Sequence, residues 1–102
     1  MAFDGTEGGA ITLANGAALT KEHRLRNPTA LKARFFGKDI LKQILEQEGC
    51  MGIRFYFAQD PDGVRELVIC GANQYEDDML DLVADFSVPC PASCSTPNAL
   101  NS

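Results

Sequence analysis

The fold is decided by residues 53–71, which read IRFYFAQDPDGVRELVICG. In the first six residues every second side chain is large and apolar, as in a strand with one buried face. The DPDG sequence at 60–63 fits a type I turn, with proline at its second position and Gly63 free to be left-handed. In the return segment 64–71, Leu67 and Ile69 alternate with Val68 and Cys70, so both faces are apolar, which is typical of a strand inside a sheet or under an oligomer contact. We therefore expect a β-hairpin over residues 51–71 that is buried against other parts of a protein.

Residues 37–48 predict the clearest helix. Its apolar side chains recur at helical spacing and form one stripe, which consists of Ile40, Leu41, Ile44 and Leu45. Gly49 follows as a natural helix stop.

Residues 11–26 allow two structures. Asn15-Gly16 between short apolar runs is a hairpin signal, whereas Thr12 suits a helix N-cap and the later residues favour a helix. We favour the helix, in which Ala14, Ala18 and Leu25 would share a face, and Asn27-Pro28 would end it.

Two further segments complete the pattern. Residues 31–36 read as a short extended link. Residues 76–87 fit neither the helical nor the strand period cleanly, and we expect a third strand paired with 64–71 because an isolated two-stranded ribbon is marginally stable.

These elements predict an α+β fold in which two helices pack on a small antiparallel sheet built on the 51–71 hairpin. A chain of 102 residues is long enough for one modest core. We expect a flexible, Gly-rich arm at 1–10, a single α+β domain at 11–88, and an irregular tail rich in Cys, Pro and Ser at 89–102.

The charge is unevenly distributed over the sequence. Residues 21–42 hold seven basic side chains against two acidic ones, and residues 76–85 hold five acidic side chains and no basic one, within a chain of net charge −5. An acidic protein repels phosphate at long range, so nucleic acid is not an expected partner. The asymmetry instead suggests self-complementary contacts, within one chain or between copies, although two solvated faces that never meet would give the same pattern.

The four cysteines are the weak candidates for a metal site. In principle they could bind zinc as a set of thiolates, and these are Cys50, Cys70, Cys90 and Cys94. Only one close doublet exists, and Cys70 lies inside an apolar strand, so plain thiols are favoured over zinc or over a disulfide that involves Cys90, Cys94 or Cys50. No cofactor is therefore expected.

Catalytic chemistry has little support in the sequence. The single histidine, His23, lies among charged residues on the expected helix and reads as a surface residue. The acidic cluster at 76–81 and the pair Asp60 and Asp62 do not have the spacing of a calcium loop, and solvated charge explains them better.

Three motifs resemble a recurrent family of short, uncharacterised bacterial proteins. They are FFGKDIL at 35–41, GCMGIRFY at 49–56 and PCPASC at 89–94, where the family has an aromatic residue in place of Ser93. The resemblance covers residues 11–102 in order and spacing. It implies one natural unit and brings no known activity with it.

The function expected from these features is a small, non-enzymatic interaction module that forms a homo-oligomer or docks on a larger protein. The residues expected to contact the partner are Arg54, Tyr56, Val68, Glu76, Asp77, Asp78, Arg24 and Arg26. The alternative is a small metal or redox protein that uses Cys50, Cys90 and Cys94. No apolar run is long enough to span a membrane, and no secretory signal is visible at residues 1–9, so a cytoplasmic location is expected.

Overall fold

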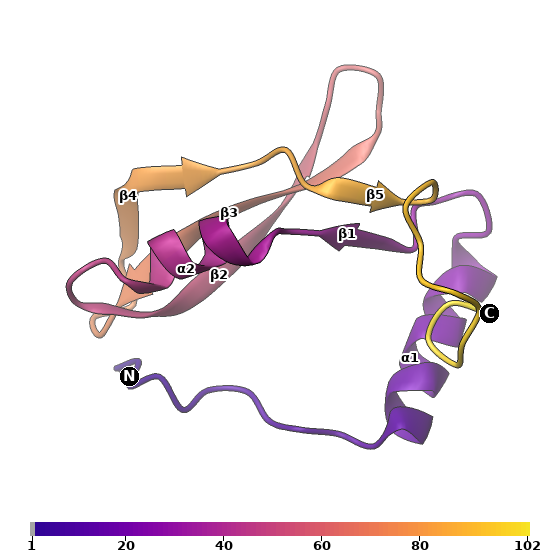
Figure 1. Ribbon diagram of the computed structural model, residues 1–102, viewed down its shortest axis with the longest axis horizontal. Coiled ribbons are helices and arrows are strands. Elements are labelled where there is room, and N and C mark those ends of the chain that lie inside the picture. Colours follow the sequence, from indigo (N-terminus) through magenta and orange to yellow (C-terminus); the bar gives the residue numbers. More distant parts are fainter. Residues whose placement is uncertain (1) are drawn as a thin grey trace. The chain divides into compact units, whose positions relative to one another are not determined.

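The computed structural model describes residues 2–102 and contains two helices and two antiparallel sheets within them (Figure 1). In chain order the elements are α1 (Leu13–Arg26), β1 (Ala33–Phe35), α2 (Lys38–Leu45), β2 (Cys50–Gln59), β3 (Arg65–Asn73), β4 (Asp78–Ala84) and β5 (Val88–Cys90). The residues form two compact units. We call residues 2–8 and 36–87 the sheet unit, and residues 9–35 and 88–102 the helical unit. The predicted α+β class with a small antiparallel sheet is confirmed.

The sheet unit is built on the predicted hairpin. Strands β2 and β3 pair without a shift in register from Ile53 opposite Gly71 to Gln59 opposite Arg65. Strand β4 lies on the other side of β3, which gives the order β2-β3-β4 and confirms the expected third strand. Gly63 closes the hairpin turn with a left-handed φ of 84°, as its position predicted.

Helix α2 covers part of one face of this sheet. Ile44 of the helix and Ile69 of β3 are both 0% exposed, and they form the core with Ala84 of β4. The helix is shorter than the predicted 37–48 because it ends at Leu45, with Glu46 as C-cap. Gly49 does not follow the last helical residue directly, and its left-handed φ of 83° lies in the turn that leads into β2.

The two faces of the sheet follow from the alternation along its strands. Side chains in register with Ile69 lie on the face that α2 covers, which we call the helix face, and they are Ile53, Phe55, Phe57 and Leu67. The opposite face, which we call the arm face, carries Arg54, Tyr56, Val68 and Cys70. Strand β3 is buried on both faces at its centre, since Cys70 is only 2% exposed, and the prediction of a strand apolar on both faces is confirmed.

Residues 2–8, the N-terminal arm, contain neither helix nor strand but make specific contacts within the sheet unit. The backbone N–H of Phe3 donates to the carbonyl of Gln74 at 2.9 Å. The carboxylate of Glu7 accepts from the N–H groups of Asp4 and Gly5. The sequence predicted a flexible arm over residues 1–10, of which Met1 lies outside the described residues.

Both turns of the sheet use one local design. The Asp60 carboxylate accepts from the N–H groups two and four residues further on, Asp62 and Val64, at 2.9 Å each. The Asn73 amide oxygen accepts in the same way from Tyr75 at 2.9 Å and Asp77 at 3.1 Å. In each turn the residue three positions after the Asp or Asn is left-handed, and in the second turn that residue is Glu76, with φ 69°.

This second turn yields a testable prediction. Because a left-handed conformation is costly for a residue with a Cβ atom, Glu76→Gly is expected to raise the free energy of unfolding by about 0.5–1 kcal/mol, after the entropy cost of glycine is subtracted. Chemical denaturation of the variant measures the change. Asp77→Gly is the matched control, because Asp77 has no positive φ, and glycine there should lower the stability. A loss of stability in Glu76→Gly would show that contacts of the Glu76 side chain outweigh the backbone strain.

In the helical unit, the helix favoured for residues 11–26 is confirmed. The Thr12 side chain accepts from the N–H of Asn15 at 3.1 Å and caps α1. Ala14, Ala18 and Leu25 share a face of α1, as expected, and all three are exposed. The sheltered side chains include Thr20 and His23, and they line a hollow of about 280 Å³ together with Leu100.

Two expected irregular segments of the helical unit pair with each other. Ala33–Phe35 of the predicted link forms β1, and Val88–Cys90, which reaches into the predicted irregular tail, forms the antiparallel strand β5. Residue pairs so far apart in sequence leave no local signal. Helix α1 belongs to the helical unit together with these strands, and α2 packs on β2 and β3 in the sheet unit.

Candidate functional site

The arm face carries a cluster of side chains that hydrogen bonds join across β2 and β4. Arg54 of β2 donates through Nη1 to the carboxylate of Asp78 on β4, and at 3.2 Å to the carbonyl of Glu76. The hydroxyl of Tyr56 donates to the other carboxylate oxygen of Asp78. Alternation along β2 places Arg54 and Tyr56 on the same face, so one carboxylate on β4 receives both.

The N-terminal arm adds an aromatic ring to this cluster. The ring of Phe3 lies over the guanidinium of Arg54, with 5.5 Å between Cζ and the ring centroid, within the range of a cation–π contact. A hollow of about 450 Å³ remains beside the arm, lined by Phe3, Glu7, Leu45, Met51, Ile53 and Arg54. The arm therefore covers the sheet incompletely near the start of β2.

The hydrogen bonds fix the ionisation of the cluster. Donation from Tyr56 and then from Arg54 holds the pKa of Asp78 below its ordinary value. The same bonds raise the pKa values of Arg54 and Tyr56. Burial raises the pKa of the Cys70 thiol, and the negative charge of Asp78 adds to that effect. The cluster thus holds a carboxylate, a guanidinium and two neutral groups, an arrangement that fixes strands together and leaves no reactive thiolate.

This ionisation predicts a specific dependence of stability on pH. The pKa of Asp78 is lower in the folded chain than its ordinary value of 3.8. At pH values between the folded pKa and this ordinary value, the unfolded chain therefore binds more protons than the folded chain. The stabilisation is complete above the ordinary value and is lost as pH falls through the folded pKa. Asp78→Asn should remove this part of the acid-induced loss, which denaturation curves measured from neutral to acid pH would detect. Asp77→Asn, at the exposed neighbouring residue, is the control, and equal pH profiles for the two variants would contradict the assignment.

Five of the residues expected to contact a partner lie close together in the sheet unit. Arg54, Tyr56, Glu76 and Asp78 belong to the cluster, and Val68 is opposite Tyr56 on the arm face. The charges of Arg54 and Asp78 are paired with each other within the chain, and their side chains are only 31% and 20% exposed. Asp77 is exposed, and its backbone closes the β3–β4 turn through Asn73.

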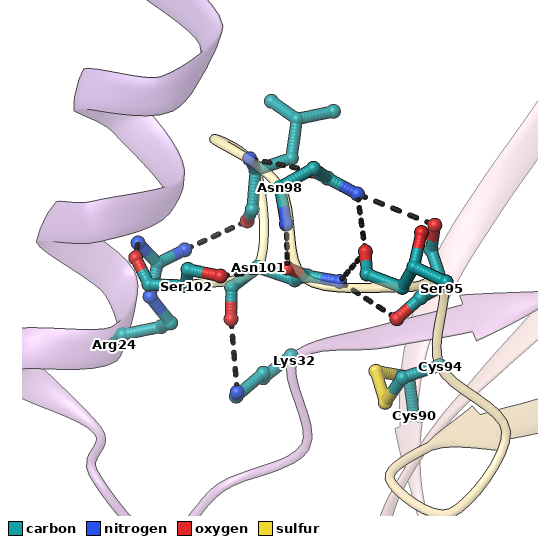
Figure 2. Close-up of a disulfide and its surroundings, with 10 residues drawn as sticks. Arg24, Lys32, Cys90, Cys94, Ser95, Asn98, Asn101 and Ser102 are labelled. Atoms are coloured by element: carbon teal, nitrogen blue, oxygen red, sulfur yellow. Dashed lines mark hydrogen bonds between the residues drawn. A yellow bond between two sulfur atoms is a disulfide. The ribbon is translucent and has the colours of Figure 1, made fainter.

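The other two expected residues, Arg24 and Arg26, lie in the helical unit. Arg24 donates to the carbonyls of Leu100 and Ser102 at 2.7 Å each, and Lys32 donates to the carbonyl of Asn101 at 3.0 Å (Figure 2). Arg26 pairs with Glu22 one turn earlier, and both side chains are largely exposed, so this pair contributes little. The basic side chains Arg24 and Lys32 therefore anchor residues 100–102.

The cysteines divide between the two units. Cys90 and Cys94 form a disulfide in the helical unit, beside the turn that Asn98 and Asn101 organise (Figure 2). The expectation of plain thiols is therefore wrong for this pair, whose separation of four residues gave no decisive signal. Cys50 and Cys70 are free, and residues 2–102 contain no group of three His, Cys, Asp or Glu side chains that could hold a metal ion.

His23 is half-buried and not a plain surface residue. Its Nε2 lies 3.1 Å from the carbonyl of Leu31, and the Asn27 amide lies 3.4 Å from Nδ1. These contacts tie the end of α1 to the segment that leads into β1, which is a structural role.

Several large apolar side chains of the sheet unit are strongly exposed. Phe57 is 94% exposed and Phe86 is 98% exposed, and Leu80, on β4, is 71% exposed. Phe86 also has a left-handed φ of 60°, which is unusual for a bulky residue. Helix α2 has only eight residues and does not extend over the hairpin tip.

Two residues of the site escaped the sequence interpretation. Phe3 was assigned to a flexible arm, and its position over Arg54 depends on a contact between distant parts of the chain. Asn73 organises the turn that precedes Asp78. The sequence signal for this role was an Asn at the start of the turn, in the position that Asp60 has in the hairpin turn, but with Glu76 in place of the glycine.

No family model, curated protein or solved structure matches the chain. The resemblance of the three motifs to a bacterial family therefore stays a hypothesis. None of the helices within residues 2–102 is long and apolar enough to cross a membrane.

Proposed function

We propose that this chain is a small, non-enzymatic protein-interaction module that self-associates through its sheet unit. The observation that carries the proposal is the imbalance of burial in that unit. Its core contains two fully buried large side chains, Ile44 and Ile69, whereas Phe57 and Phe86 are 94% and 98% exposed. Single exposed apolar residues are common, but phenylalanines this exposed next to so small a core are typical of a surface that a partner covers.

Apolar contacts, and not charge pairing, supply the driving force in this proposal. Charged residues that the sequence suggested as partner contacts form ion pairs inside the chain. Arg54 pairs with Asp78, and Arg26 pairs with Glu22. Each copy also carries a net charge of −5, so copies repel at long range. Added salt should therefore leave the association unchanged or strengthen it.

Light scattering on a sizing column tests the proposal directly. We expect a mass above that of one chain that is indifferent to a chelator and to a reductant. A monomer at every concentration and salt level would overturn self-association. A multimer that falls apart on chelation would favour the alternative, a metal or redox protein that uses Cys50, Cys90 and Cys94.

We also propose a cytoplasmic location, and the Cys90–Cys94 pair provides its test. Cytoplasmic thiols are normally kept reduced. This location therefore predicts that all four cysteines react when cells are treated with an alkylating reagent and lysed under denaturing conditions. A pair that stays protected until a reductant is added would place the chain in an oxidising compartment.

A further inference from the structure

The outer edge of β2 is the part of the sheet unit best suited to a second copy of the chain. Among residues 2–102, the sheet order β2-β3-β4 leaves one side of β2 without a neighbouring strand. We propose that two copies pair antiparallel along β2, with Phe55 of one copy opposite Phe55 of the second. The inference rests on the proposed self-association and specifies which edge forms it.

The backbone of β2 offers a regular row of hydrogen-bonding groups to that partner. The N–H of Asp60 donates to the carbonyl of Val64 at 2.9 Å, so the backbone N–H of Asp60 points toward the β3 side of the hairpin. In an antiparallel pair this property alternates, and the register is unbroken from Ile53 to Gln59. The amides of Ile53, Phe55 and Phe57 therefore face outward, away from β3. The arm lies near the start of β2, where a Cβ atom on Gly5 would be 3.5 Å from the carbonyl oxygen of Met51.

The charges of the two edge strands select β2. Strand β2 contains one charged side chain, Arg54. Strand β4, at the opposite edge, contains Asp78 and Asp81 and is followed by Asp85, so two β4 edges would repel each other. Charged edge strands are a common protection against edge-to-edge pairing. In the sheet that this pairing forms, the two outermost strands are the acidic β4 strands, which repel further pairing, so this sheet stops growing at a dimer.

The register follows from the same residues. With a two-fold axis at Phe55, Phe55 pairs with Phe55 of the second copy, and Ile53 pairs with Phe57 of the second copy. In each pair the outward N–H groups donate to the outward carbonyl oxygens of the other chain. Arg54 then lies opposite Tyr56 of the other chain, whereas an axis at Arg54 would place two arginines opposite each other. In this register Phe57, which is 94% exposed in the single chain, packs beside Ile53 of the second copy on the helix face.

Amide hydrogen exchange at low and high protein concentration tests the inference without any substitution. In the dimer the outward amides of Ile53, Phe55 and Phe57 should exchange at about one tenth of their rate in the monomer, or more slowly still. The exchange rates of the inward amides of Arg54 and Tyr56 should change little. An oligomer in which the outward amides stay fast would overturn the edge pairing and leave self-association standing. A chain that is monomeric at all concentrations would overturn both.

A matched pair of variants gives a second test. Phe57→Lys places a charge in the proposed contact, and Leu80→Lys introduces a lysine on the opposite edge strand, where Leu80 is 71% exposed. We expect Phe57→Lys to be a folded monomer and Leu80→Lys to keep the dimer mass, with circular dichroism to confirm the fold of both. A dimer in Phe57→Lys, or a monomer in Leu80→Lys only, would contradict the proposed edge.

Discussion

Replacement of Ile69 by alanine is expected to lower the free energy of unfolding by about 2–5 kcal/mol. Ile69 is 0% exposed and packs between Ile44 of α2 and Ala84 of β4. The substitution removes buried apolar surface and leaves a cavity that the short helix above it cannot fill completely. Because so few large side chains are buried in the sheet unit, no other contact can compensate.

Urea denaturation followed by the far-ultraviolet signal measures this loss. Leu80→Ala is the matched control, since Leu80 is also a large aliphatic residue of the sheet but is 71% exposed, and we expect a change within about 0.5 kcal/mol. Equal losses in the two variants would show that the packing of the sheet unit differs from the one described above.

Gly71→Ala is expected to destabilise the chain by about 1–3 kcal/mol through overpacking. A Cβ atom at Gly71 would lie 2.9 Å from Sγ of Cys50, 3.1 Å from Nε2 of Gln47 and 3.4 Å from Cγ2 of Ile44. Gly71 is buried on the central strand, so neither the strand nor α2 can move away easily. The glycine is needed here for close packing, since its φ is not positive.

A double-mutant cycle isolates the cause. Cys50→Ala removes the sulfur atom in the closest contact, so the two substitutions together should cost less than the sum of their separate effects. Gly52→Ala is the control, because a Cβ atom there meets nothing within 4 Å. Strict additivity between positions 50 and 71 would show that the Gln47 or Ile44 contact, and not Cys50, limits the space.

Local signals explain which elements could be predicted. The hairpin follows from strict alternation on each side of a DPDG turn, and α1 follows from the Thr12 cap, because both depend on residues close together in the sequence. The end of α2 was placed too late because apolar spacing continues only to Leu45 while residues 46–48 have no helix-breaking side chain. The third strand was expected from the need of a hairpin for more neighbours.

The candidate site was predicted only in part. Arg54, Tyr56, Val68, Glu76 and Asp78 were chosen from the sequence as partner contacts, and they do lie near one another. Their roles differ from the expectation because Asp78 accepts hydrogen bonds from Arg54 and Tyr56 of the same chain. That contact joins residues more than twenty positions apart, and no local pattern encodes it.

The sequence by itself determined the α+β class and the hairpin with its turn, and it favoured the helix that Thr12 caps. Periodicity, capping and turn chemistry operate over a few residues, so they can be read without the fold. Only the tertiary structure decided the β1–β5 pairing and the Cys90–Cys94 disulfide. The same is true of the contact between Phe3 and Arg54 and of the exposure of Phe57 and Phe86. Each of these depends on which distant segments meet and how far α2 extends over the sheet, and apolar residues carry the same sequence signal whether they are covered or left for a partner.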